Sequence, residues 1–325
     1  MAYHTIESHI DTISVLAGLE KDMKRVLVTG APGFIGRQSL LPLLERDYEV
    51  HALYMKEPIE SDARIIWHKA NLLEKSSALN LCATIQATHL LHFAWYVHPQ
   101  DYKTSSLNSL WKDATLSLLE AFQKNGGIRA VLAGTNMEYD FNTPQGVFQE
   151  YMSPIAPATI YGKAKNETRI LAEEFAGAND LSLAWGRIFN LYGPHEAPTR
   201  LMPQIIFSLL DGKTPQITSG GLIRDYTFVK DTAGAFVSLL DSNVTGIVNI
   251  ASGKPLTLKN IALSTAEILG ASDLVEPIAE TIPENEPARI VADVTRLTKE
   301  VDWVPRYDLR TGLEESIAWW RINPR

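Results

Sequence analysis

A glycine-rich turn between a strand and a helix sets the strongest limit on how this chain folds. Residues 25–29 have the pattern of an apolar strand, residues 30–36 read Gly-Ala-Pro-Gly-Phe-Ile-Gly, and residues 38–46 have helical spacing. Such glycines let the backbone approach a pyrophosphate closely, and the N-terminus of the helix supplies N–H groups and positive potential. The pattern predicts a dinucleotide site, with a purely structural turn as the alternative. The expected contacts are Gly30, Gly33, Phe34, Ile35 and Gly36.

Strand and helix patterns alternate through the first part of the chain. We expect strands at residues 25–29, 49–54, 64–68, 89–94, 129–134 and 181–187, and helices at residues 38–46, 76–86, 105–125 and 161–176. This alternation predicts an α/β fold, a Rossmann-type doubly wound parallel sheet that binds ligands at the carboxyl ends of its strands.

The regular alternation of strands and helices ends after residue 187, where loops rich in Pro and Gly separate shorter elements. There we expect strands at residues 215–218 and 246–251 and helices at residues 202–210, 258–269 and 313–320. We therefore divide the chain into three parts. They are a peripheral N-terminal extension at residues 1–22 with helical spacing, a dinucleotide-binding domain at residues 23–186 to which parts of the later chain add, and a smaller, mainly substrate-binding lobe at residues 187–325.

The end of the second strand favours NADP over NAD as the cofactor. An NAD site usually carries Asp or Glu about 20 residues past the glycines, where it binds the ribose 2′-hydroxyl. Tyr54 takes that place here, with Lys56 just beyond it and Arg37 at the head of the first helix. Two cations without a carboxylate suit a 2′-phosphate, whereas NAD is the alternative if both cations are only solvated. The other expected cofactor contacts are Asn71, Leu72, Phe93, Ala94 and Trp95.

Tyr161 and Lys165 lie four residues apart at the start of an expected helix, so both side chains lie on one face. A tyrosine normally titrates near ~10, and a neighbouring ammonium favours the phenolate and lowers this pKa. Such a pair can move a proton at neutral pH. A surface Tyr and Lys on an ordinary helix is the alternative for the pair alone, and its combination with the glycine-rich turn favours the catalytic reading.

Composition excludes several classes of function. The net charge of −8 over 325 residues argues against nucleic acid or an anionic membrane as the main partner. No apolar run approaches the ~20 residues of a membrane span, and the start has no signal-peptide pattern. The single cysteine, Cys82, suits a reducing compartment, so we expect a cytoplasmic protein. The eight histidines show no paired spacing, and we expect no metal.

Residues 24–325 resemble the extended short-chain dehydrogenase/reductase family, the group of NAD(P)-dependent nucleotide-sugar epimerases, dehydratases and ketoreductases. The resemblance is carried by the glycine motif, by Thr135 four residues before Tyr139, and by Tyr161-x-x-x-Lys165. It is also carried by Arg-Ile-Phe-Asn-Leu-Tyr-Gly-Pro at residues 187–194, Arg-Asp-Tyr at residues 224–226 and Asn-Ile-Ala-Ser-Gly at residues 249–253.

The resemblance implies catalytic roles for three residues. Tyr161 would be the general acid or base, and Thr135 would orient the reacting oxygen. Lys165 would hold the nicotinamide ribose and lower the pKa of Tyr161. The resemblance further implies a nucleotide-diphosphate sugar as the substrate, and a homodimer that forms through the helices at residues 105–125 and 161–176.

Two residues of the C-terminal part match family residues that contact the diphosphate of the substrate, namely Asn190 and Arg224. A turn residue is the alternative for Asn190, and an ion pair with Asp225 or another acid is the alternative for Arg224. Trp95, Tyr96 and Met137 are expected to wall the sugar pocket, with aromatic core packing as an equal alternative. The remaining expected substrate contacts are Asn136 and Arg200.

Departures from the family pattern reduce the number of reactions that this chain is expected to catalyse. In the family's 4,6-dehydratases, Asp and Glu directly follow the residue that matches Thr135, but here Asn136 and Met137 stand there and neither can carry a proton. Glu138 comes one residue later, and on an extended strand it would point to the other face. A dehydratase is therefore not expected. Cys82 lies in an early helix, so the Cys-dependent chemistry of some carbon-3/5 epimerases has no candidate.

Three hypotheses remain. The first is NADPH-dependent reduction of the C4 carbonyl of a nucleotide-diphosphate-linked 4-keto-6-deoxy sugar, with Tyr161 as the proton donor. The second is an NAD-dependent nucleotide-sugar C4 epimerase, in which a retained cofactor oxidises and then reduces the same carbon. The expected preference for NADP favours the reductase. The third is a non-catalytic dinucleotide-binding sensor or scaffold, and the intact Thr135, Tyr161 and Lys165 argue against it.

Overall fold

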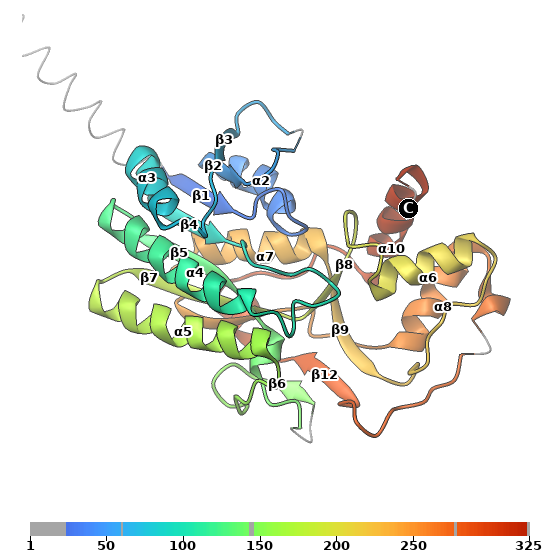
Figure 1. Cartoon of the computed structure of the whole chain (residues 1–325). Coiled ribbons are helices and arrows are strands. Elements are labelled where there is room, and N and C mark those ends of the chain that lie inside the picture. Colours follow the sequence, from blue (N-terminus) through green and yellow to red (C-terminus); the bar gives the residue numbers. More distant parts are fainter. Residues whose placement is uncertain (1–23, 60, 143–145, 276–277, 324–325) are drawn as a thin grey trace, which may run out of the picture.

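A seven-stranded parallel sheet forms the larger half of the molecule (Figure 1). The structure, a computed structural model, describes residues 24–59, 61–142, 146–275 and 278–323. The strands follow the order β10-β7-β5-β4-β1-β2-β3, and each neighbouring pair is parallel. Their bounds are Arg25–Thr29 (β1), Glu49–Tyr54 (β2), Ile66–Lys69 (β3), His89–His92 (β4), Arg129–Thr135 (β5), Ser182–Ile188 (β7) and Gly246–Ile250 (β10).

Helices cover both faces of this sheet (Figure 1). One face carries α3 (Lys75–Ile85), α4 (Leu107–Lys124) and α5 (Ile160–Ala178), and the other carries α2 (Gly36–Leu44) and α7 (Val229–Asp241). Each helix turns an apolar stripe inward, as Leu118, Leu119 and Phe122 show on α4. The predicted Rossmann-type doubly wound sheet is confirmed. Its strand order reverses between β1 and β4, where open α/β sheets bind their ligands.

A smaller lobe is built mainly from the C-terminal part of the chain and packs around a core of its own (Figure 1). Its mixed sheet has the order β11-β9-β12-β6, and β8 pairs with β9. The strands are β6 (Val147–Phe148), β8 (Asn190–Tyr192), β9 (Ile223–Phe228), β11 (Pro255–Thr257) and β12 (Arg289–Ala292). The helices of this lobe are α6 (Leu201–Leu210), α8 (Leu258–Leu269) and α10 (Leu309–Ile322), with the 3-10 turn η2 (Ser272–Leu274). The short helix α9 (Thr295–Lys299) packs against β10 of the larger sheet, and the 3-10 turn η1 (Asn136–Glu138) follows β5.

Most expected elements match the structure within a few residues, and β1, β2 and α8 match at both ends. The expected strand at residues 215–218 is wrong. Pro215 has no N–H to donate, and its carbonyl accepts from the N–H of Ile217 to close a local turn instead of joining a sheet. The short strands β6, β8, β11 and β12 were not expected, and the predicted helix at residues 1–22 lies outside the described residues.

Within the described ranges, no helix combines the length and the apolar character needed to cross a membrane.

Candidate active site

The glycine-rich turn after β1 is held tightly against the end of β4. Gly30 has a φ of 67°, and a Cβ atom there would come within 2.8 Å of the backbone nitrogen of Ala94. A Cβ at Gly36 would overlap the carbonyl oxygen of Gly30. Both positions therefore require glycine, and the close packing brings the start of α2 next to the sheet edge, where its first N–H groups have no partner within the helix.

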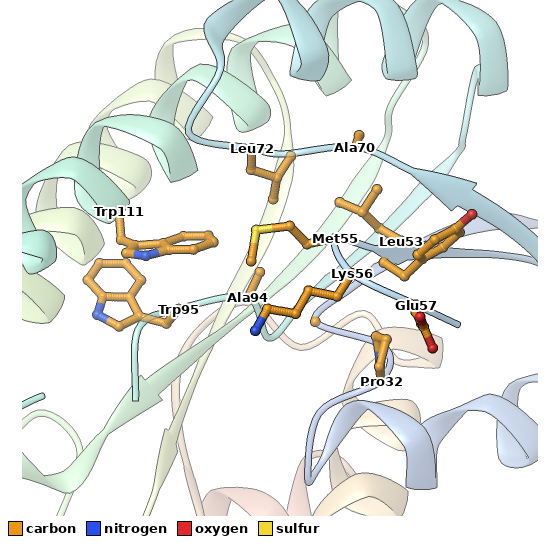
Figure 2. A pocket seen from close by; sticks show the side chains of 12 residues that line it. Pro32, Leu53, Met55, Lys56, Glu57, Ala70, Leu72, Ala94, Trp95 and Trp111 are labelled. Atoms are coloured by element: carbon orange, nitrogen blue, oxygen red, sulfur yellow. The ribbon is translucent and has the colours of Figure 1, made fainter. Parts of the chain in front are cut away.

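A pocket opens beside this turn, at the carboxyl ends of β1, β2 and β4 (Figure 2). Figure 2 shows the Lys56 ammonium directed into the middle of the pocket and the Glu57 carboxylate near Pro32. Of the predicted cofactor contacts, Gly30, Tyr54, Lys56, Leu72, Ala94 and Trp95 line this pocket. Apolar walls with a cation among them fit the adenosine half of a dinucleotide.

Other predicted cofactor residues have partners away from the pocket. The Asn71 amide donates to Glu74, at 3.1 Å from Nδ2 to Oε1, and the ring of Phe93 packs edge-on against Phe236. Neither residue lines the pocket. Glu57 does line it and was missed, although a carboxylate three residues past the end of β2 was a readable signal.

Arg37 is directed away from the place where a 2′-phosphate was expected. Its guanidinium donates to the carbonyl oxygen of Pro32 at 2.7 Å and to that of Gly33 at 3.3 Å. It also donates to Nδ1 of His195 at 2.6 Å, and Arg37 is not among the residues that line the pocket. Arg37 therefore braces the glycine-rich turn and ties it to the loop after β8.

Tyr161 lies in the first turn of α5, at the carboxyl edge of the sheet. The Thr159 hydroxyl caps this helix by accepting from the N–H of Gly162 at 3.0 Å. The Tyr161 ring packs edge-on against Tyr102, with centroids 5.1 Å apart, and against Trp95. Burial raises the pKa of the Tyr161 phenol, and its hydrogen bond with Thr135 works in the opposite direction.

Lys165 is buried beneath Trp95. Its Nζ donates to the carbonyl oxygen of Ala133 at 2.8 Å and lies 3.7 Å from the ring centroid of Trp95. Burial lowers the pKa of Lys165 to about 7, against the favourable charge of Glu138. The pKa of Tyr161 is thus not lowered by Lys165 as predicted, because desolvation raises it and the opposing influences come from Thr135 and Arg200. Trp95, and not Lys165, forms the pocket wall.

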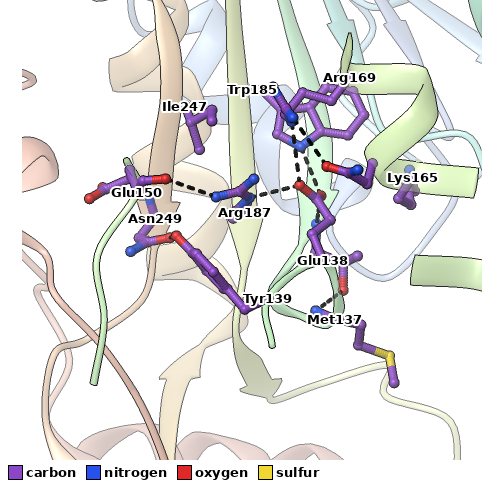
Figure 3. Close-up of polar contacts among 12 residues, drawn as sticks. Met137, Glu138, Tyr139, Glu150, Lys165, Arg169, Trp185, Arg187, Ile247 and Asn249 are labelled. Carbon is purple, nitrogen blue, oxygen red and sulfur yellow. Dashed lines mark hydrogen bonds and ion pairs between the residues drawn. The ribbon is translucent and has the colours of Figure 1, made fainter. Parts of the chain in front are cut away.

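A buried polar network is centred on Glu138, at the end of β5 (Figure 3). Glu138 Oε1 accepts from the backbone N–H of Thr135 and from Trp185 Nε1, both at 2.9 Å, and Glu138 Oε2 accepts from Arg187 Nε at 2.7 Å. Glu138 and Arg187 are both fully buried. Residues 136–138 form the turn η1, not the extended strand that was expected, so Glu138 folds back as part of a capping box.

Three predicted substrate contacts, Asn136, Met137 and Tyr96, have different surroundings. Asn136 opens η1, and the Met137 sulfur lies 4.0 Å from the Tyr102 hydroxyl, within the aromatic cluster around Tyr161. Tyr96 instead donates to the carboxylate of Asp101 in an exposed loop.

The predicted diphosphate contacts lie along β8 and β9. Asn190 pairs in register with Tyr226, so the two side chains lie on one face of these strands, and Arg224, two residues before Tyr226, shares that face. Asn190 donates to the carbonyl oxygen of Asp225 at 3.2 Å, and Arg224 donates to that of Pro287. The ion-pair alternative for Arg224 is met by another acid, Glu286, and not by Asp225. Asp225 accepts from the N–H groups of Ser252, Gly253 and Ala292, whereas Arg224 lies 3.6 Å from Glu286.

Glu196 is a residue near the site that sequence reasoning missed. It lies on the loop after β8 and is 7% exposed, and its Oε2 atom has no hydrogen-bond partner within the described residues. Burial raises the pKa of Glu196 to about 8, although the charge of Arg200 lowers it. The spacing of Glu196 and Arg200 on a loop carried no periodic signal that could have marked them as neighbours.

The comparisons with known proteins place the chain in a family. The family model described as the NAD dependent epimerase/dehydratase family matches residues 26–251. UDP-glucuronic acid decarboxylase 1 of Xenopus tropicalis is 25% identical, over 93% of this chain and 73% of the relative. UDP-glucose 4-epimerase of Corynebacterium glutamicum is 26% identical, over 91% of this chain and 95% of the relative. The chain therefore belongs to the NAD-dependent epimerase/dehydratase family, as its motifs predicted.

A solved structure with the same fold is the dTDP-glucose 4,6-dehydratase of Bacillus anthracis in complex with NAD. It is 22% identical, covers 92% of this chain and 97% of its own, and has a TM-score of 0.78. These relatives and this neighbour are named for three different reactions, so the similarity does not choose among them. Within the described residues, no group of three side chains is arranged to hold a metal ion.

We predict that the buried ion pair beneath Thr135 makes a large contribution to stability. Arg187→Met removes the cation nearest the buried Glu138 carboxylate and leaves Arg169, at 3.9 Å, as its ion-pair partner, so the free energy of unfolding should fall by about 3 kcal/mol. Arg310→Met is the matched control, since Arg310 pairs with Glu314 on the surface and its loss should cost at most ~1 kcal/mol. Urea unfolding measures both variants, and a loss as small as that of the control would contradict the prediction.

We also predict a pH-dependent contribution from Glu196. Its folded-state pKa of about 8 lies above the value of 4.5 for an ordinary glutamate, so the folded chain keeps a proton that the unfolded chain has lost. Wild-type stability should therefore fall relative to Glu196→Gln as pH rises through this window. Melting temperatures at pH 5, 7 and 9 measure the difference. Glu280→Gln, at an exposed position, should stay parallel to wild type, and a Glu196→Gln curve that also stays parallel would refute the prediction.

Proposed function

We propose that this chain transfers hydride between a nicotinamide and carbon 4 of a nucleotide-linked sugar. The favoured reaction is the NADPH-dependent reduction of a nucleotide-diphosphate-linked 4-keto-6-deoxy sugar. The observation that carries the proposal is the position of Tyr161, hydrogen-bonded to Thr135 and in contact with Trp95 at the end of the dinucleotide pocket. Family membership supports a nucleotide sugar as the substrate class.

The dinucleotide, when bound, supplies the hydride that adds to the carbonyl carbon. As the carbon–oxygen double bond becomes a single bond, Tyr161 Oη gives its proton to the oxygen, and solvent returns a proton to the phenolate. Thr135 orients the oxygen through its hydroxyl. Burial keeps the pKa of Tyr161 high, so the phenol is protonated, which is the form a reductase needs.

No side chain described at this place can act as the acid or base that the elimination of water requires. Asn136 and Met137 carry no proton, and every polar partner of Glu138 described above belongs to the buried network. A dehydratase would need a free carboxyl at this place, so we do not propose that reaction.

A C4 epimerase with retained NAD is the second candidate, and Glu57 favours it. A carboxylate at the end of β2 is the usual partner of the ribose 2′-hydroxyl of NAD, and Glu57 lines the pocket together with Lys56. NADP as cofactor thus depends on Lys56, since Arg37 is engaged elsewhere.

Tyr161→Phe should reduce turnover by about 10²–10⁴-fold while leaving the affinity for the dinucleotide within twofold, because only the transferable proton is lost. The assay follows NADPH absorbance with a set of nucleotide-linked 4-keto-6-deoxy sugars. Unchanged turnover in this variant would support the hypothesis of a non-catalytic dinucleotide-binding sensor. Failure of the wild type with every keto sugar, together with interconversion of two saturated sugars, would identify the epimerase.

Lys56→Ala should weaken NADP binding about tenfold and leave NAD binding within twofold, because a charge-assisted bond to a phosphate is lost. Arg37→Ala is the matched comparison. It should weaken both dinucleotides alike, since its guanidinium holds backbone carbonyls of the turn. Calorimetric titration measures all four affinities, and equal losses of NADP and NAD in Lys56→Ala would support the NAD epimerase instead.

We propose a homodimer through α4 and α5, which lie side by side on one face of the sheet (Figure 1). Their outer surface exposes Leu110 and Ile170, at 52% and 39%. Leu110→Glu with Ile170→Glu should convert a dimer into a monomer by light scattering at micromolar concentration. Leu79→Glu on α3 is the control and should not. A monomeric wild type would contradict the proposal.

A further inference from the structure

Glu196 combines deep burial with an unused hydrogen-bonding atom. Buried polar side chains normally have a partner, and an unpaired one is costly. Within the described residues, Glu196 Oε2 has none, and the nearby Arg200 guanidinium lies over the ring of Tyr102. Both oxygens of Glu138, by contrast, accept hydrogen bonds, from Thr135, Trp185 and Arg187. The free oxygen therefore points to a ligand.

Contacts connect Glu196 to the expected proton donor. The Arg200 guanidinium lies 5.2 Å from the ring centroid of Tyr102, and the Tyr102 ring lies 5.1 Å from that of Tyr161. Glu196 lies on the loop directly after β8, four residues before Arg200, and the charge of Arg200 acts on its carboxyl. The preceding strand β8 carries Asn190, which shares a face with Arg224.

The charges of this neighbourhood decide which part of a substrate each residue suits. A diphosphate is attracted by Arg200, whereas a buried, protonated carboxyl offers it no charge and can exchange a hydrogen bond with a sugar hydroxyl. We propose that Glu196 is a specificity residue that hydrogen-bonds a hydroxyl of the substrate's hexose ring, beside Arg200 at the diphosphate. This inference rests on the proposed function, which brings the hexose to Tyr161.

The test distinguishes the contribution of the sugar to binding from that of the nucleotide. The full chain, saturated with NADP⁺ so that no reduction occurs, is titrated by calorimetry with UDP, dTDP, UDP-glucose and dTDP-4-keto-6-deoxyglucose. Glu196→Ala should raise the dissociation constant of the best nucleotide sugar about tenfold and that of its nucleoside diphosphate less than twofold. Glu196→Gln keeps one carbonyl oxygen and should raise the first constant about threefold. Glu280→Gln, at an exposed position, is the control and should change neither.

Each other outcome overturns the inference. Equal weakening of the sugar nucleotide and the free nucleotide would show that Glu196 acts on the fold or on Arg200. No change in either constant would show that Glu196 touches no sugar. If Glu196→Ala no longer binds NADP⁺ and has therefore lost its fold, Glu196→Gln decides by the same comparison. A wild type that binds none of the four probes would overturn the proposed function as well, which distinguishes the two failures.

Discussion

The buried ion pair between Glu138 and Arg187 is the constraint on which the active-site edge depends. Two charges at zero exposure are tolerated only when their lone pairs and protons are used, and Glu138 uses both oxygens on Thr135, Trp185 and Arg187. These bonds close the turn after β5 and fix the backbone of Thr135, whose side chain hydrogen-bonds Tyr161. The same bonds leave Glu138 without a free oxygen for chemistry. An acid close to the site in sequence is therefore structural.

Burial, more than charge pairing, sets the protonation of the Tyr161–Lys165 pair. A helix start places both side chains on one face, which the sequence alone could establish. It could not establish that Trp95 would lie over the ammonium or that both groups would be almost fully buried. Desolvation raises the pKa of a phenol and lowers that of an ammonium. Both shifts favour a neutral pair, and a neutral phenol suits proton donation to a reduced carbonyl.

The elements that could be predicted from the sequence are those that a pattern of neighbouring residues specifies. β1, β2 and α8 follow from apolar periodicity and were predicted to the residue, as was the glycine turn with its steric demand. Short strands such as β8 and β11 were missed, because three residues give no period to detect and their pairing with β9 is decided by tertiary contact. Among site residues, the helix spacing of Tyr161 and Lys165 was readable. The loop position of Glu196 was not, because it depends on where distant segments pack.

Arg37 was predicted to bind a phosphate, but in the structure its guanidinium is held by groups of the protein itself. Its place at the head of α2 suggested a phosphate ligand, yet it donates to Nδ1 of His195, which must then be the unprotonated nitrogen of that ring. Burial and the Arg37 charge lower the pKa of His195 to about 4, so the imidazole is neutral and able to accept. The His195 ring also packs on Trp319 of α10, with centroids 4.5 Å apart. The glycine turn, the last helix and the loop that carries Glu196 thus meet at one histidine. A shift of the turn would reach the residue directly before Glu196 through Arg37, so the glycine-rich turn and the loop after β8 are mechanically joined at His195.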